Sequence, residues 1–298
     1  MNGFRPLRRI PRRWWLGSGW CIVARERRHP AGRQRIPEPM VMNDPDSVAQ
    51  FHAGGVSNPA MVAMYDFGAR ALDALVPPGG RVLDLGVGSG RALSAVLRRR
   101  PDLEATAVDL APNMLATARE LFAAEGLDQR VELVQADITA LPDRLATSRW
   151  DAVSCMWTLH QLPHFDALRG ALRQIAVLRR HSGAAVWISD FQRMRDPSSG
   201  DAVLRCLDPS LPAALRRDGI ASEAAAFTRA ELSAELAAAG LDDVRCGYLR
   251  PLPYLQAYWI PSAHPKPTTS TSVRRSTVHG RARPAAALLR WGFTAKPF

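Results

Sequence analysis

The sequence has few cysteines, no long apolar run and no evident metal-ligand cluster. Its four cysteines are far apart and form no Cys-x-x-Cys pair, so neither a disulfide framework nor a zinc site is predicted. The seven histidines show no metal-ligand spacing with acids or cysteines, and we expect no catalytic metal. No apolar run reaches the roughly 18 residues of a membrane-spanning helix. Scattered thiols are typical of a reducing compartment, which predicts a cytoplasmic protein.

Acidic residues are scarce at both ends of the chain. Residues 1–40 contain ten arginines and two glutamates, and residues 251–298 contain seven Lys or Arg and no acid. Of the net charge of +11, these ends carry +8 and +7, which leaves −4 on residues 41–250. A mildly acidic body attracts a polyanion poorly. We therefore expect no nucleic acid partner and, without a spanning helix, no membrane partner.

Composition divides the chain into one domain and two basic extensions. Residues 1–40 mix arginine pairs, prolines and tryptophans without periodicity, which favours a disordered extension over a signal or transit peptide. Residues 262–298 are rich in Pro, Ser, Thr and Arg, which predicts a low-complexity tail with a short helix at 285–291 as an alternative. Residues 41–261 then form one domain of ordinary size.

The most informative segment is residues 81–90, Arg-Val-Leu-Asp-Leu-Gly-Val-Gly-Ser-Gly. An apolar run around Asp84 leads into three glycines at alternate positions, Gly86, Gly88 and Gly90. A helical pattern follows, so the segment predicts a strand, a tight turn and a helix N-terminus that a ligand approaches closely. Dinucleotide enzymes place a third glycine three residues after the second, but Arg91 occupies that place here.

Three later strands are predicted, and each leads into a short candidate binding segment. They span 103–109, 131–137 and 150–156, and the candidate residues at their carboxyl ends are Asp109-Leu110, Asp137-Ile138 and Cys155-Met156. Open α/β sheets bind ligands at these strand ends, and an acid after the second strand suits ribose hydroxyls. Each acid also has a plain structural role open to it, as a cap of the turn or helix that follows.

In this order the segments resemble the motifs of class I S-adenosylmethionine-dependent methyltransferases, over about residues 45–260. The resemblance implies an α/β fold, with a Rossmann-like seven-stranded, mostly parallel sheet, helices on both faces and a C-terminal antiparallel hairpin. It implies S-adenosyl-L-methionine as the cofactor and methyl transfer to an O, N or C nucleophile of a small-molecule acceptor. The implied cofactor-binding residues are Asp84, Gly86, Gly88, Gly90, Asp109, Leu110, Asp137, Ile138, Cys155 and Met156.

The resemblance also implies where on the cofactor these residues act. Asp84 would contact the amino-acid end of the donor, directly or through water, and Asp109 the ribose. Asp137 would accept a hydrogen bond from the adenine amine, with Ile138 against the ring. The Cys155-Met156 pair would lie near the sulfonium.

Strands and helices alternate through most of the chain, which predicts a parallel sheet covered by helices. Helices are predicted at 58–75, 89–99, 113–125, 165–180 and 228–240, and further strands at 184–190, 244–249 and 253–259. Residues 194–227 interrupt the alternation. They form either a lid over an acceptor or a surface helix pair without a binding role.

A sulfonium methyl group is already electrophilic, so a general base is needed only for a protonated, weakly acidic acceptor. His160 and His164 are the candidate catalytic bases, because an imidazole titrates near neutrality. Surface or helix-cap roles are equally open to both. Gln161 stands where the family often has a second histidine. Asp190 and Tyr65 are further candidates on the substrate side.

Two other functions are compatible with the sequence. A nicotinamide-dependent Rossmann oxidoreductase is disfavoured by Arg91 in the glycine segment and by the Asp137-Ile138 pair. A methyltransferase-like binding protein without turnover would carry the same motifs. The acceptor atom and the oligomeric state do not follow from the sequence.

Overall fold

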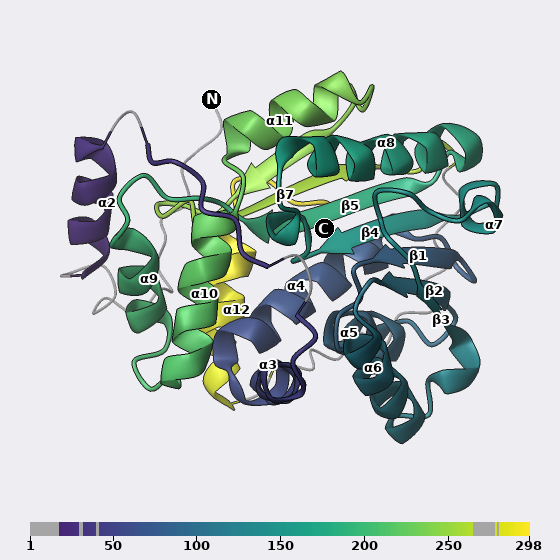
Figure 1. Ribbon diagram of the computed structural model, residues 1–298, viewed down its shortest axis with the longest axis horizontal. Helices are drawn as coiled ribbons and strands as arrows, with labels where there is room; N and C mark the ends of the chain where they lie inside the picture. Colours follow the sequence, from purple (N-terminus) through teal and green to yellow (C-terminus); the bar gives the residue numbers. More distant parts are fainter. Residues whose placement is uncertain (1–17, 30–31, 40–41, 265–277, 279) are drawn as a thin grey trace.

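The computed structural model describes residues 18–29, 32–39, 42–264, 278 and 280–298 and is built around one seven-stranded sheet (Figure 1). The strand order is β3-β2-β1-β4-β5-β7-β6. The strands are β1 (Arg81–Leu85), β2 (Glu104–Asp109), β3 (Val131–Gln135), β4 (Ala152–Met156), β5 (Ala185–Phe191), β6 (Arg245–Tyr248) and β7 (Leu255–Ile260). The first five strands pair in parallel, and β7 is antiparallel to both β5 and β6. The predicted fold class is confirmed.

Helices cover both faces of the sheet (Figure 1). One face carries α4 (Pro59–Leu75), α5 (Arg91–Arg99) and α6 (Pro112–Ala124), and the other carries α7 (Asp143–Ala146), α8 (Phe165–Ser182) and α11 (Arg229–Ala238). Each face has its own apolar core, in which Trp187 and Leu83, for example, are fully buried on opposite sides. Because both faces are covered, central strands such as β4 are buried along their whole length.

The basic N-terminal segment is packed against the domain in its described part, so the expectation of a disordered extension is wrong there. Helix α2 (Ser18–Arg28) contacts α9 (Ser199–Leu207). The Glu26 carboxylate accepts hydrogen bonds from two backbone amides of the loop before α9, and Arg33 forms an ion pair with Glu223. These contacts hold residues 18–29 and 32–39, whereas residues 1–17 lie outside the described residues.

The described part of the C-terminal tail is also packed. A short 3-10 turn, η3 (Gly280–Ala282), leads into α12 (Arg283–Gly292), which confirms the alternative of a helix at 285–291. Helix α12 contacts α4, and the rings of Phe293 and Phe67 lie 4.5 Å apart between centroids. Residues 280–298 therefore belong to the folded body, and residues 265–277 and 279 lie outside the described residues.

Four helices gather beside the carboxyl ends of β4 and β5 (Figure 1). They are α3 (Pro45–Ser57), α9, α10 (Ala213–Ala225) and α12. Two 3-10 turns complete the fold, η1 (Asp128–Arg130) before β3 and η2 (Leu159–Gln161) after β4. Within the described ranges, no helix combines the length and apolar character needed to cross a bilayer.

Candidate active site

A cavity of about 70 Å³ lies at the carboxyl ends of β1, β2 and β4. We call it the donor cavity. Its floor is the glycine loop after β1 together with the ends of β2 and β4, and α3 and α4 cover it. The lining residues are Met42, Phe51, Tyr65, Gly86, Val87, Gly88, Ser89, Arg91, Ala92, Asp109, Leu110, Ala111, Met114, Met156, Trp157, Thr158 and Gln161.

Two of the loop glycines are required by their conformation and their neighbours. Gly86 has φ +78°, and a Cβ atom there would lie 2.2 Å from Thr158 Cγ2. Gly90 has φ +82° at the N-terminus of α5, and its Cβ would lie 2.9 Å from Phe122 Cζ. Side chains are excluded at both positions. The loop is fixed in place because Gly86 N donates to Val108 O at 2.8 Å.

Asp109 lines the donor cavity and also holds the glycine loop. Its Oδ2 accepts a hydrogen bond from Gly88 N at 2.7 Å, and its Oδ1 accepts one from Ala111 N at 2.9 Å. Burial raises the pKa of the Asp109 carboxyl, and these amide donors oppose the rise. The N-cap position of α6 is Ala111, so Asp109 is not the cap. Ribose binding by Asp109 stays a prediction.

Asp84 lies beneath the loop rather than in the cavity lining. Its side chain is 2% exposed, and Ser154 Oγ on β4 donates a hydrogen bond to its Oδ1 at 2.6 Å. Burial raises the pKa of Asp84 to about 7, although the Ser154 hydrogen bond opposes the rise. The structure therefore does not place this carboxylate at the cavity surface, and a contact with the donor through water stays a prediction.

Four more predicted cofactor residues lie outside the donor-cavity lining. Asp137 Oδ1 accepts a hydrogen bond from Thr139 N at 2.7 Å, which is the structural role of a turn cap. Ile138 and Cys155 are buried in the core on the α8 side of the sheet, and Gly90 begins α5. The predicted residues that do line the cavity together are Gly86, Gly88, Asp109, Leu110 and Met156.

The part of the donor-cavity cover that α3 forms was not predicted. Asp44 caps α3 through a hydrogen bond from Ser47 N at 2.9 Å, and Pro45 follows; this capping signal is visible in the sequence. On α3, His52 Nε2 lies 2.7 Å from Arg91 Nη2. Burial and then the Arg91 charge lower the pKa of His52, so the neutral ring can accept from the guanidinium.

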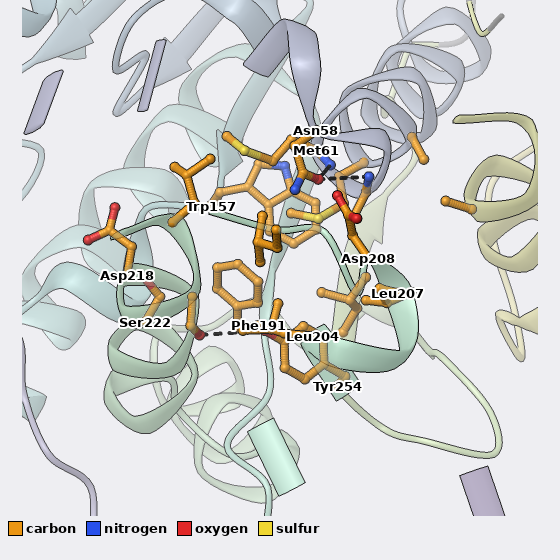
Figure 2. A pocket seen from close by; sticks show the side chains of 18 of the residues that line it. Asn58, Met61, Trp157, Phe191, Leu204, Leu207, Asp208, Asp218, Ser222 and Tyr254 are labelled. Atoms are coloured by element: carbon orange, nitrogen blue, oxygen red, sulfur yellow. Dashed lines mark hydrogen bonds between the residues drawn. The ribbon is translucent and has the colours of Figure 1, made fainter. Parts of the chain in front are cut away.

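A second cavity, of about 130 Å³, adjoins the donor cavity. We call it the acceptor cavity. Both cavities are lined by Met42, Phe51, Tyr65, Trp157 and Gln161. Figure 2 shows Trp157, Met61, Phe191, Leu204 and Tyr254 around the acceptor cavity, with Asp218 and Ser222 on one side and Asp208 on the other. Its wall comes from α4, α9, α10 and α12, so the 194–227 insertion lines a cavity.

Trp157 follows the end of β4 and lines both cavities. It is the non-glycine residue with positive φ, +59°, among the described residues, a conformation that marks functional sites when the surroundings impose it. Trp157 N donates to Ser189 O at 2.8 Å, which holds the backbone turn. Its indole Nε1 is buried and has no hydrogen-bond partner within the part of the chain that the structure describes.

His160 is 3% exposed and lines the acceptor cavity. Its Nδ1 lies 2.7 Å from Asp190 Oδ1, and its backbone N donates to Asp190 Oδ2 at 2.9 Å. Its Nε2 lies 3.3 Å from Glu38 Oε1. Burial lowers the pKa of the ring, but the charge and hydrogen bond of Asp190 and the contact with Glu38 outweigh it and raise the pKa to about 10.

His164, the other candidate base, lies apart from both cavities. It is exposed, and its Nδ1 accepts a hydrogen bond from Ala167 N at 3.1 Å as the N-cap of α8. The structure thus distinguishes two histidines that were equal candidates for the base in the sequence, because only His160 lines a cavity. Sequence reasoning missed Glu38, Trp157 and Thr158, of which Glu38 was assigned to the N-terminal extension. Among the described residues, no group of three or more His, Cys, Asp or Glu is arranged to hold a metal ion.

Comparison with known proteins agrees with this arrangement. Residues 82–183 match the family described as "Methyltransferase domain". Together with the strand order and the glycine-loop cavity, this match shows that the chain carries a class I S-adenosylmethionine-dependent methyltransferase domain. The predicted family is therefore confirmed.

Two curated relatives and one solved structure illustrate the likeness. The chain is 32% identical over 151 residues to 3-hydroxy-5-methyl-1-naphthoate 3-O-methyltransferase of Streptomyces sahachiroi, covering 49% of this chain and 41% of the relative. It is 31% identical over 118 residues to the ubiquinone/menaquinone biosynthesis C-methyltransferase UbiE of Dinoroseobacter shibae, covering 39% and 44%. The chain thus spans less than half the length of these relatives. The mitomycin 7-O-methyltransferase MmcR shares the fold at a TM-score of 0.51 and 18% identity, with 84% of this chain and 68% of that chain covered.

Proposed function

We propose that this protein transfers a methyl group from S-adenosyl-L-methionine to the hydroxyl oxygen of a small, largely apolar ring compound. The observation that carries the proposal is the adjacency of the two cavities, which share five lining residues and have His160 on the acceptor side. A donor and an acceptor bound in them are held side by side, and such positioning supplies much of the rate of a transfer reaction.

S-adenosylmethionine, when bound, supplies the electrophilic methyl group. The glycine loop would let it approach the backbone closely, because Gly88 and Ser89 line the donor cavity and Gly88 has no side chain. Asp109 would meet its ribose hydroxyls. Met42 and Phe51 lie over the cavity and would exclude water from the reacting groups.

The acceptor cavity favours an apolar molecule of about the size of one aromatic ring. A dry cavity of about 150 Å³ holds benzene, and the acceptor cavity measures about 130 Å³. An adjoining cavity of about 400 Å³ shares Leu207, Asp208 and Leu288 with it and would take a larger substituent. A ring system that extends from the first space into the second matches both volumes.

Oxygen is proposed as the acceptor atom because of the pairing of His160 with Asp190. A hydroxyl must lose its proton during methylation, and an imidazole oriented by a carboxylate is suited to take it. The relatives do not decide the acceptor atom, because one is named as an O-methyltransferase and the other as a C-methyltransferase. The choice of oxygen over nitrogen and carbon therefore depends on His160 and Asp190.

The experiment is incubation of the full chain with methyl-labelled S-adenosylmethionine and a metabolite extract, followed by mass spectrometry of labelled products. A labelled ether is the expected product. With the acceptor in hand, His160→Gln should lower kcat by about 10²–10⁴-fold. The matched control His164→Gln should leave kcat unchanged and cost about 1 kcal/mol of stability at most, as a lost helix cap.

Three results would contradict the proposal. One is unchanged turnover in His160→Gln at saturating donor. Another is thermal stabilisation of the protein by NAD without stabilisation by S-adenosylmethionine, which would favour the oxidoreductase alternative. The third is absence of donor binding at millimolar concentration.

A further inference from the structure

Residues 32–39 form a strap that contacts η2 and the end of α10 beside the acceptor cavity. Ile36 N donates to Ala224 O at 3.1 Å, which ties the strap to the end of α10. The Arg35 guanidinium donates to the carbonyl oxygens of His160 at 2.8 Å and Pro163 at 2.9 Å, and also to those of Leu162 and Ala225. The strap is therefore attached to the turn η2 that carries His160.

The strap places Glu38 on the free nitrogen of the His160 ring. Glu38 Oε1 lies 3.3 Å from Nε2, and Ser222 Oγ donates to the same oxygen at 3.3 Å. Asp190 already occupies Nδ1 at 2.7 Å. An imidazole with a carboxylate on each nitrogen satisfies both contacts only as the doubly protonated cation, because each nitrogen must donate. In this state the ring cannot accept a proton.

We propose that Glu38 is a positioning residue of the acceptor site, which holds His160 doubly protonated until the hydroxyl of an acceptor displaces it from Nε2. This inference rests on the proposed function for its catalytic meaning, but the contact itself concerns the free protein. The Glu38 contact is the longer of the two and its side chain is 15% exposed, against 3% for Asp190. Glu38 is thus the partner that can leave.

The Nε2 proton of His160 must leave before the ring can accept the proton of the hydroxyl. As Glu38 leaves, the Nε2 proton passes to its carboxylate and from there to water. The neutral Nε2 then accepts the hydroxyl proton while the acceptor oxygen forms its bond to the methyl carbon and the carbon–sulfur bond of the donor breaks. One proton is released per turnover, and the more exposed Glu38 lies on its route to solvent.

Several charged groups around the His160 ring determine how far its proton affinity should fall when Glu38 is removed. Asp190 comes from β5, Glu38 from the strap and Asp218 from α10, where the positive charge of His160 acts on the Asp218 carboxyl. Arg35 opposes them from the backbone side of η2. Removal of Glu38 alone leaves Asp190 and Asp218, so the affinity of the ring for its proton should fall but stay above that of a free imidazole.

The test is an NMR titration of the full chain with ¹³C-labelled histidine rings, without donor or acceptor. The His160 signal is assigned with His160→Gln. Glu38→Gln should lower the His160 midpoint by at least one pH unit, a tenfold loss of proton affinity. Glu38→Asp keeps the charge on a shorter side chain and should give an intermediate midpoint. Ser222→Ala keeps both carboxylates and should move the midpoint least.

Phenol serves as the probe for displacement. Added at saturation, it should lower the midpoint of the wild-type His160 towards that of Glu38→Gln and change the variant little. Equal midpoints in the wild type and Glu38→Gln would overturn the inference, and so would a wild-type midpoint that phenol leaves in place. The titration without phenol needs no methyl transfer, so its failure is distinct from failure of the proposed function.

Discussion

Gly86 and Thr158 come from different strand ends and touch across the floor of the donor cavity. Thr158 Oγ1 donates a hydrogen bond to Gly86 O at 3.1 Å, and the space that a side chain on residue 86 would need is filled by the threonine. The loop after β1 and the turn after β4 are thereby fixed to each other. The donor cavity depends on this contact for its shape.

Gly86→Ala should therefore reduce donor binding and stability together. The positive φ alone costs about 1–2 kcal/mol for a residue with a Cβ, and the clash with Thr158 adds to it. We expect the Kd for S-adenosylmethionine to rise at least tenfold in isothermal titration. Gly79→Ala is the matched control, because Gly79 has φ +64° with nothing within 4 Å of its Cβ position. Equal effects of the two substitutions would contradict the role of the contact.

Asp84 should make stability depend on pH in an unusual direction. Its pKa in the folded protein is about 7, above the 3.8 of a free aspartate. The folded state therefore keeps a proton that the unfolded chain loses, so the stabilisation present below about pH 4 is lost as the pH rises to 7. The loss is on the order of 4 kcal/mol.

Urea unfolding at pH 4 and pH 8 measures this contribution. Asp84→Asn cannot ionise and should lose less stability between the two pH values than the wild type. Ser154→Ala removes the hydrogen bond that favours the charged carboxylate. This variant should lose more stability between pH 4 and pH 8 than the wild type does. If Asp84→Asn loses as much stability between pH 4 and pH 8 as the wild type, the pH dependence comes from other groups.

Leu289 on α12 should contribute to acceptor binding although it lies in the C-terminal tail. It is 5% exposed and lines the acceptor cavity. Leu289→Ala should cost about 2–5 kcal/mol of stability and raise the acceptor KM several-fold, with the donor Kd unchanged. Trp291→Ala is the control, since Trp291 is 62% exposed and should change stability by about 0.5 kcal/mol or less. An acceptor KM that Leu289→Ala does not change would remove α12 from the site.

The strands, most helices and the glycine loop could be predicted because their signals are local. Apolar runs, glycines at alternate positions and capping residues such as Thr228, which forms a capping box with Glu231, act within one element or one turn. Their order along the chain also predicts the parallel sheet, and hence that the ends of β1, β2 and β4 meet. Asp109 and Met156 were predicted on this basis, and the structure brings them to one cavity.

The acceptor side depended on contacts between distant segments, and only the tertiary structure decided it. Composition assigned Glu38 and Leu289 to basic extensions, yet packing against α10 and α4 brings these two residues to the site. His160 and His164 have the same chemistry and lie four residues apart, but the end of β5 puts Asp190 beside one ring while the other caps α8. The sequence by itself determined where a cofactor loop forms, because local backbone geometry requires it. The partners of each side chain were decided by the fold, because burial and charge pairing join residues that are far apart in the sequence, such as His160 with Asp190 and with Glu38.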